Sequence, residues 1–157
     1  MRQLQEIAEA ARRVKHAVAK LGTNDKNRGL CAIADALTAH ADEIIAANQI
    51  DIENGRANGL SDGLIDRLML DKKRIEGIAE GCRQVAALPD PVGEVLGMSR
   101  RPNGLVIGRK RVPMGVIGII YEARPNVTVD AAALCFKAGS ACILRGGKEA
   151  FHSSMCL

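Results

Sequence analysis

The sequence predicts an α/β fold in which helices come first, a β-hairpin follows, and a strand–helix–strand unit comes last. Apolar residues recur at spacings of three and four through residues 4–37, which is typical of amphipathic helices. The pair Asn103-Gly104 separates two strand-like segments, as in a hairpin. The apolar run 116–120, which does not alternate, is typical of a strand in a parallel sheet. We therefore expect a helical region (1–88), a linker and hairpin (89–114) and a strand–helix–strand unit (115–157).

Composition places the chain among ordinary globular proteins. Its 157 residues are 47% apolar and 25% charged, which argues against disorder and favours one domain or two small ones. The net charge of +4 is dispersed among acids and gives only weak support for a polyanionic partner. The charged, amphipathic amino terminus does not resemble a signal peptide, and no apolar run is long enough to span a membrane. We therefore expect a cytoplasmic protein without membrane or nucleic-acid contact.

The helical region has recognisable starts and stops. An apolar stripe runs through the first helix as far as Leu21, Gly22 ends that helix, and Thr23 or Asn24 is expected to cap the second. Shorter helices are expected at 41–47 and 61–68, with a loop at 54–58 between them. Asp71 is a plausible N-cap for a longer helix that ends near residue 87.

The predicted hairpin has arms at 94–101 and 105–112, and Pro102-Asn103-Gly104 joins them. Asn-Gly readily adopts the positive φ angles of a tight hairpin turn. The arms carry five basic residues, which could mimic a nucleic-acid patch: Arg100, Arg101, Arg109, Lys110 and Arg111. We favour a solvated surface or a subunit contact instead, because no aromatic residues are interleaved for base stacking.

In the last unit, a strand at 116–120, expected to be buried on both faces, stops before Pro125. A crossover helix at 126–138 then ends at Gly139, and a second strand covers 140–144. The sequence Arg145-Gly146-Gly147-Lys148 follows at the strand's carboxyl end, where open α/β sheets bind ligands and where a helix N-terminus attracts phosphate. The alternative is an ordinary turn, since neither GxGxxG nor GxxxxGK[ST] is present.

The five cysteines are odd in number and have no paired short spacings, which argues against a disulfide framework and a zinc site. We expect all five to have structural roles. The three histidines, His16, His40 and His152, show no metal-ligand spacing and are expected to be surface or packing residues.

Two blocks, RVPMGVIGIIYEARPNVTVDAAALCFKAG and ILRGGKEA, resemble the γ-glutamyl phosphate reductase family of the aldehyde dehydrogenase superfamily. The resemblance extends upstream through PVGEVLGMSRRPNGLVIGRKRVP and, more loosely, into the helical region. It implies that residues 115–157 begin a Rossmann-like cofactor domain of aldehyde dehydrogenase type. It also implies NADPH-dependent reduction of L-glutamyl 5-phosphate to L-glutamate 5-semialdehyde with release of phosphate, a step of proline biosynthesis. A homo-oligomer and a glutamate 5-kinase partner are further expectations of this kind.

The resemblance also assigns roles to single residues. Asn126 matches the superfamily asparagine that donates to the oxyanion formed when a cysteine thiolate attacks; the alternative is a helix cap. Arg124 would meet a substrate carboxylate or phosphate, or else pair with Glu122. Arg145 matches a strand-end lysine that contacts the adenosine ribose. Lys148 falls near the place of an acid in NAD-preferring members, so NADP is the expected cofactor.

Members of the family continue well beyond the point that corresponds to Leu157, and their nucleophilic cysteine lies in that later part. We therefore expect a truncated cofactor domain, and we expect the 157-residue chain to lack reductase activity by itself. The end of the chain, FHSSMCL, also departs from the longer helix that the family leads us to expect. The alternative function is that of a non-catalytic binding or interaction fragment that associates with a full-length subunit.

Overall fold

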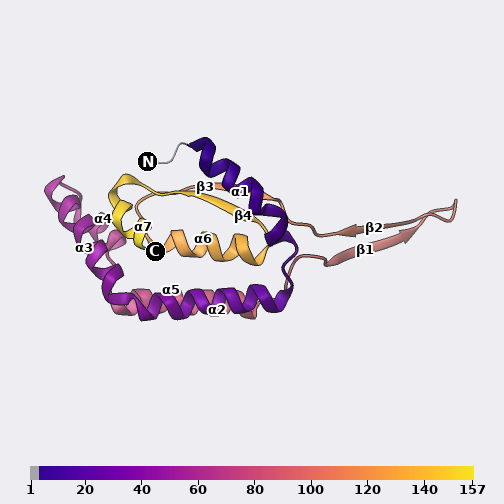
Figure 1. Cartoon of the computed structure of the whole chain (residues 1–157), viewed down its shortest axis with the longest axis horizontal. Helices are drawn as coiled ribbons and strands as arrows, with labels where there is room; N and C mark the ends of the chain where they lie inside the picture. The colour runs from indigo at the N-terminus through magenta and orange to yellow at the C-terminus, as the bar shows by residue number, and fades with distance from the viewer. Residues whose placement is uncertain (1–3) are drawn as a thin grey trace.

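The computed structural model describes residues 4–157 and arranges them in layers (Figure 1). A two-stranded parallel sheet lies between one helix on its upper side and a helix below it, and a pair of long helices forms the lowest layer. In chain order the elements are α1 (Leu4–Ala19), α2 (Thr23–Ala39), α3 (Ala41–Ala57), α4 (Asp62–Leu68), α5 (Lys72–Ala87), β1 (Val95–Arg100), β2 (Val106–Lys110), β3 (Val116–Ile120), α6 (Asn126–Lys137), β4 (Ala141–Arg145), the 3₁₀ turn η1 (Lys148–Ala150) and α7 (Phe151–Cys156). The predicted order of helices, hairpin and strand–helix–strand unit is confirmed.

The main core lies where α2, α5 and α6 meet, below the sheet. Leu30 and Ala34 from α2 and Ile75 from α5 are almost completely buried there. Gly29 allows α2 to approach α6, because an added Cβ would lie 2.9 Å from the ring of Phe136. Burial of a large aliphatic side chain contributes roughly 1.5–3 kcal/mol, so this core helps to hold the helical layer to the strand–helix–strand unit.

Helix α3 runs to Ala57, so the loop predicted at 54–58 and the end predicted at Ala47 are wrong. Gly55, which suggested a break, faces α4 instead. A Cβ at Gly55 would lie 3.0 Å from Ile65 Cδ1 and 3.1 Å from Leu60 Cδ1, so the glycine permits close helix packing. A glycine costs a helix about 1 kcal/mol relative to alanine, and tertiary packing offsets this cost here.

One of the predicted helix N-caps is confirmed, and the other is wrong. Asp71 caps α5, since its Oδ1 accepts the backbone N–H of Arg74 at 2.6 Å. Gly22 occupies the N-cap position of α2, and Thr23 is the first residue of that helix, so neither Thr23 nor Asn24 is the cap. The Thr23 hydroxyl donates to Asp90 at 3.0 Å instead. The stripe of α1 is also less buried than its pattern suggests, because only Ala11 of that helix is buried.

Strands β1 and β2 pair antiparallel in the predicted hairpin, which projects away from the rest of the molecule (Figure 1). Of the turn residues only Gly104 has a positive φ, at +86°, so the expectation that Asn103 shares this conformation is wrong. The Asn103 side chain accepts the N–H of Leu105 at 3.1 Å and stabilises the turn in that way. Every residue of both strands is exposed.

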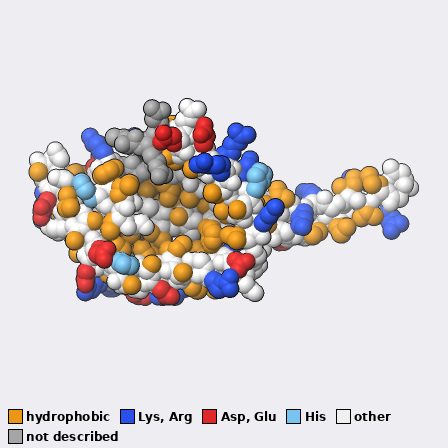
Figure 2. All heavy atoms as spheres, viewed as in Figure 1, with side chains coloured by type: hydrophobic (Ala, Val, Ile, Leu, Met, Phe, Trp, Pro, Cys, Tyr) orange, Lys and Arg blue, Asp and Glu red, His pale blue; other side chains and the backbone are white. Residues whose placement is uncertain are grey.

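Strands β3 and β4 pair parallel, with Ile117 opposite Cys142 and Ile120 opposite Arg145. Helix α6 connects them and ends at Lys137, so Ala138 holds the C-cap position expected of Gly139, which follows with φ of +69°. Strand β3 is not buried on both faces, because its residues alternate between exposed and half-buried and Ile120 is 76% exposed. Figure 2 shows apolar side chains gathered on the face between α1 and the lower helices. The division at residues 88/89 and 114/115 stays a prediction, and residues 1–3 of its first region lie outside the described residues.

Candidate functional site

Two adjoining pockets lie beyond the carboxyl ends of β3 and β4. The Asn126 pocket, of about 390 Å³, is lined by Asp66, Arg67, Met69, Leu70, Arg74, Gly77, Ile78, Arg124, Asn126 and Asp130. The Arg145 pocket, of about 490 Å³, is lined by Leu60, Leu64, Arg67, Ile120, Tyr121, Glu122, Ala123, Arg124, Arg145, Gly147 and Glu149. Arg67 and Arg124 line both pockets, so these two side chains form their common wall. Carboxyl ends of parallel strands are where α/β sheets bind ligands.

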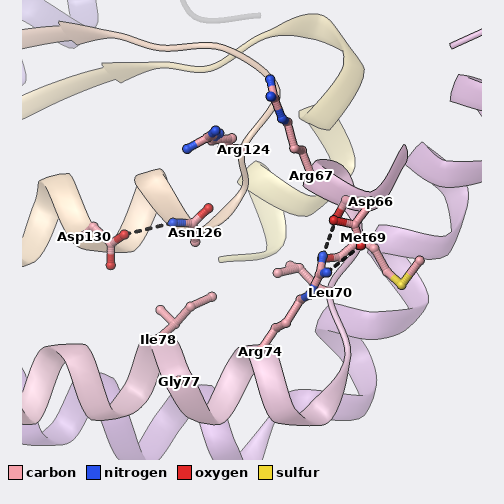
Figure 3. Close-up of a pocket in the computed structure, with 10 residues that line it drawn as sticks. All are labelled: Asp66, Arg67, Met69, Leu70, Arg74, Gly77, Ile78, Arg124, Asn126 and Asp130. Atoms are coloured by element: carbon pink, nitrogen blue, oxygen red, sulfur yellow. Dashed lines mark hydrogen bonds and ion pairs between the residues drawn. The ribbon is translucent and has the colours of Figure 1, made fainter. Parts of the chain in front are cut away.

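Asn126 lies at the start of α6 and belongs to the first pocket (Figure 3). Its Nδ2 donates to Oδ2 of Asp130, one turn further along the helix, at 3.0 Å. The residue is the first of the helix, Pro125 holds the N-cap position, and the helix has no side-chain capping bond. The capping alternative therefore fails, and the amide retains a second N–H that Asp130 does not use.

Arg124 extends from the connection between β3 and α6 (Figure 3). Its backbone N–H donates to the carbonyl of Glu122 at 2.8 Å, which tightens this connection. Within residues 4–157 its guanidinium makes no ion pair with Glu122, so the alternative in which those two side chains pair is not realised. The guanidinium is exposed and available to a ligand in either pocket.

Gly146 and Gly147 pack against the β3–α6 connection. A Cβ at Gly146 would lie 3.2 Å from the Tyr121 ring, and one at Gly147 would lie 2.7 Å from Glu149 Oε2 and 3.2 Å from the backbone nitrogen of Ala123. The two glycines therefore let the loop after β4 lie directly on the loop after β3. Tyr121, the first residue after β3, links the end of β4 to α6, because its N–H donates to the Arg145 carbonyl at 3.1 Å and its hydroxyl lies 2.7 Å from Thr128 Oγ1.

Two of the four predicted cofactor-binding residues line the Arg145 pocket. Arg145 and Gly147 line the Arg145 pocket, whereas Gly146 and Lys148 are not among its lining residues. Lys148 is exposed at the start of η1, next to Glu149, which does line the pocket. Three arginines in that pocket face two glutamates, and Leu60, Leu64 and Ile120 supply an apolar wall. Cations beside an apolar wall suit a ligand that has both anionic and apolar parts.

Arg67 was missed by the sequence analysis. It lies in α4, a seven-residue helix whose sequence carries no chemical motif, and only the fold brings it beside Arg124. Two buried residues of α4, Ile65 and Leu68, anchor the helix in a cluster with Ile52 and Ala150. The exposed Arg67 between them is therefore directed away from that cluster, and Figure 3 shows it reaching toward the β3–α6 connection.

A buried polar network supports the site and was also missed. Asn48, 1% exposed, donates through Nδ2 to the Leu68 carbonyl at 2.8 Å and to Ser153 Oγ at 2.9 Å. Its Oδ1 accepts the N–H of Leu70 at 2.7 Å. One side chain thus connects the end of α4, next to Arg67, with the helix that follows the glycine pair. Asn48 gave no motif, because its neighbours in space lie 20 to 105 residues away.

The cysteines lie apart from both pockets. Neither pocket is lined by a cysteine, and all five cysteines are free thiols. Among the described residues no group of three or more histidine, cysteine or acidic side chains could hold a metal ion. No helix of that part of the chain is long and apolar enough to cross a membrane. The polar side chains that line the two pockets are arginines, one asparagine, one tyrosine and carboxylates.

Comparison with known structures gives the class of fold first. A probable aldehyde dehydrogenase from Listeria monocytogenes superposes with a TM-score of 0.66 at 13% identity, over 96% of this chain and 30% of that one. The γ-glutamyl phosphate reductase of Thermotoga maritima superposes with a TM-score of 0.94 at 42% identity, over 99% of this chain and 37% of that one. The chain thus has the fold of the corresponding part of an aldehyde dehydrogenase.

Sequence comparison finds more similar relatives. The γ-glutamyl phosphate reductases of Carboxydothermus hydrogenoformans and Lachnospira eligens are 58% and 56% identical to this chain over all 157 residues. Over its whole length the chain is thus similar to one part of the γ-glutamyl phosphate reductases, and it spans about 38% of the length of these curated relatives. No model of a protein family matches it.

Proposed function

We propose that this chain provides the oxyanion-binding asparagine and the start of the cofactor site of an NADPH-dependent reductase that converts L-glutamyl 5-phosphate to L-glutamate 5-semialdehyde. One observation carries the proposal. The Asn126 amide, fixed by its bond to Asp130, opens into a pocket that shares two arginines with the Arg145 pocket at the ends of β3 and β4. Substrate and cofactor can therefore meet across that common wall.

Asn126 would stabilise the negative oxygen that forms when a thiolate attacks the acyl phosphate. Asp130 holds one Nδ2 hydrogen, which fixes the orientation of the amide before the reaction and leaves the other hydrogen for the oxyanion. Loss of one such donor typically lowers the rate by ~10² to 10³. Because no cysteine lines either pocket, we infer that the thiol comes from the part of the full-length relatives that this chain does not span.

Arg124 would bind the phosphate or the carboxylate of the substrate, since its guanidinium lines the Asn126 pocket without an ion pair to Glu122. A guanidinium binds either group through two parallel hydrogen bonds. Expulsion of phosphate leaves a dianion, and a cation beside it lowers the cost of that charge. Arg124 would therefore both orient the substrate and favour departure of the phosphate.

NADPH would occupy the Arg145 pocket and supply the hydride. Arg145 would contact the adenosine ribose, and the loop of Gly146 and Gly147 would bring backbone N–H groups toward the phosphates. Lys148 would attract the 2′-phosphate, where an acid would repel it. We propose further that the complete enzyme is a homo-oligomer of the cytoplasm and receives its labile substrate from a glutamate 5-kinase.

A hybrid enzyme tests the proposal. Residues 1–157 replace the matching segment of the Carboxydothermus reductase, to which they are 58% identical, and NADPH oxidation is followed with L-glutamyl 5-phosphate. The hybrid should turn over, and Asn126→Ala should lower kcat by ~10² or more. Asn54→Ala, a change of the same kind at an exposed position outside both pockets, is the control and should retain kcat. Full turnover in the Asn126→Ala hybrid would remove the catalytic role from this residue.

A further inference from the structure

We propose that Arg67 and Arg124 together bind one phosphate group at the common wall of the two pockets. The proposal rests on the proposed function and extends it, because it names Arg67 as a second anion-binding residue. The two side chains come from α4 and from the β3–α6 connection, more than fifty residues apart in sequence, and they line the same two pockets. Figure 3 shows both guanidinium groups on the strand side of the Asn126 pocket.

Arg67 is free to bind a ligand because a different arginine, Arg74, already donates to the nearby hydrogen-bond acceptors. Arg74 donates to the carboxylate of Asp66 at 2.6 Å, to the Asp66 carbonyl, and to the Met69 carbonyl at 3.0 Å. These are the acceptors on either side of Arg67 at the end of α4. Within residues 4–157, Arg67 itself makes no ion pair and no side-chain hydrogen bond, although two pockets open onto it.

The backbone at Arg67 is held in place by neighbouring residues, through burial and hydrogen bonds that do not involve its guanidinium. Leu68, the next residue, is completely buried, and Ile65 is 5% exposed in the same cluster. Asn48 holds the carbonyl of Leu68 and the N–H of Leu70, so the chain immediately after Arg67 cannot move without breaking buried hydrogen bonds. A binding residue on a fixed backbone loses less conformational entropy when its ligand arrives.

A phosphate group matches this wall better than a single carboxylate does. Two guanidinium groups from different segments offer donors to more than two oxygens, and arginine pairs with phosphate through two parallel hydrogen bonds. The four pocket carboxylates, Asp66, Glu122, Asp130 and Glu149, do not fill this role, because within residues 4–157 none of them makes an ion pair with Arg67 or Arg124. The phosphate can belong to the substrate or to NADPH, and both belong to the proposed reaction.

The test uses the 157-residue chain and isothermal titration calorimetry with inorganic phosphate at constant ionic strength. The variants are Arg67→Gln, Arg67→Lys and, as the control for loss of one positive charge, Arg28→Gln. Arg28 is 80% exposed, and within residues 4–157 its only ion pair is with Asp25 on the surface of α2. Circular dichroism and the unfolding midpoint establish that each variant is folded. Loss of charged hydrogen bonds in Arg67→Gln should weaken phosphate binding by about tenfold or more, with Arg67→Lys intermediate.

A second titration, in saturating NADPH, identifies the source of the phosphate. If inorganic phosphate still binds, Arg67 and Arg124 bind the phosphate of the substrate. If NADPH displaces inorganic phosphate, the two arginines bind a phosphate of the cofactor. The proposal is overturned if the wild-type chain binds no phosphate at millimolar concentrations, or if Arg67→Gln and Arg28→Gln bind it equally well. Turnover of the hybrid enzyme is measured independently. Absence of phosphate binding at Arg67 can therefore be distinguished from absence of reductase activity.

Discussion

Ser153, close to the carboxyl end of the chain, is held by Asp51 of α3 through two hydrogen bonds to a single oxygen. The Ser153 backbone N–H lies 2.7 Å and its Oγ 2.6 Å from Asp51 Oδ2. The other carboxylate oxygen accepts the backbone N–H of His152 at 3.1 Å and lies 2.8 Å from its Nδ1. Asp51 is 2% exposed, so its charge is compensated almost entirely by these donors at the first turn of α7.

Replacement of Asp51 by alanine should therefore destabilise the protein. It would leave the Ser153 hydroxyl and two helix N–H groups buried without this acceptor, and we expect a loss of about 2–3 kcal/mol in the free energy of unfolding. Asp42→Ala on the same helix is the control, because Asp42 is 83% exposed in a surface pair with Lys72 and its loss should have little effect. Urea unfolding measures both variants, and equal midpoints would show that Asp51 does not anchor α7.

A second buried pair joins the helical layer to the linker before the hairpin. Lys26 has no exposed side-chain surface, and its Nζ donates to both carboxylate oxygens of Asp90 at 2.9 Å. Burial alone raises the pKa of Asp90, but hydrogen bonds from Lys26, from the Val92 N–H and from Thr23 outweigh it and lower the pKa below its ordinary value. The ionised carboxylate is thus stabilised by folding.

Because the folded pKa of Asp90 is lowered, its contribution to stability is complete above the ordinary carboxyl pKa of about 4. The contribution is lost as the pH falls from there through the lowered pKa. At neutral pH, Asp90→Asn should destabilise the protein by about 3–5 kcal/mol, since it leaves the Lys26 charge buried without an opposite charge. Urea unfolding at a series of pH values should show the difference from wild type shrinking in acid; a difference independent of pH would contradict this account.

Thiol reactivity should separate the five cysteines into two groups. Cys31 and Cys156 are exposed, whereas Cys82 and Cys135 are buried and Cys142 is half-buried. Burial raises the pKa of the latter three thiols; Asp130 adds to the effect at Cys82, and Cys135 adds to it at Cys142. The thiolate is the reactive form, so each unit of increase in pKa lowers reactivity about tenfold.

With iodoacetamide at pH 8, mass spectrometry should therefore find Cys31 and Cys156 labelled first. Cys82, Cys135 and Cys142 should react on the same time scale only after denaturant is added. Early labelling of Cys142 in the folded chain would show that β4 is more open than the structure has it.

The strand–helix–strand unit could be predicted because residues close together in the sequence determine its strands and turns. Residues 116–120 have β-branched apolar character, Pro125 and Gly139 mark the turns, and the parallel pair β3–β4 forms with those residues. The burial of β3 on both faces was wrong because it depends on neighbouring layers, and within the described residues β3 has only one strand beside it.

Long-range contacts account for what the sequence did not predict. Gly55 suggested a break, but the cluster of Ile65 and Leu68 against α3 keeps the helix continuous. Asn126, Arg124 and Arg145 were predicted from local motifs and lie at one end of the sheet. Arg67 has no local motif, and only the packing of α4 reveals it as a residue of the site.

A titration with dinucleotides tests whether the Arg145 pocket binds NADPH. NADPH and NADH are titrated separately into the 157-residue chain, and binding is followed by the change in nicotinamide fluorescence. NADPH should bind more tightly than NADH, and Arg145→Ala combined with Lys148→Glu should shift the ratio of the two affinities toward NADH. Equal binding of the two dinucleotides by the wild-type chain, or a ratio that the double substitution leaves unchanged, would contradict the account.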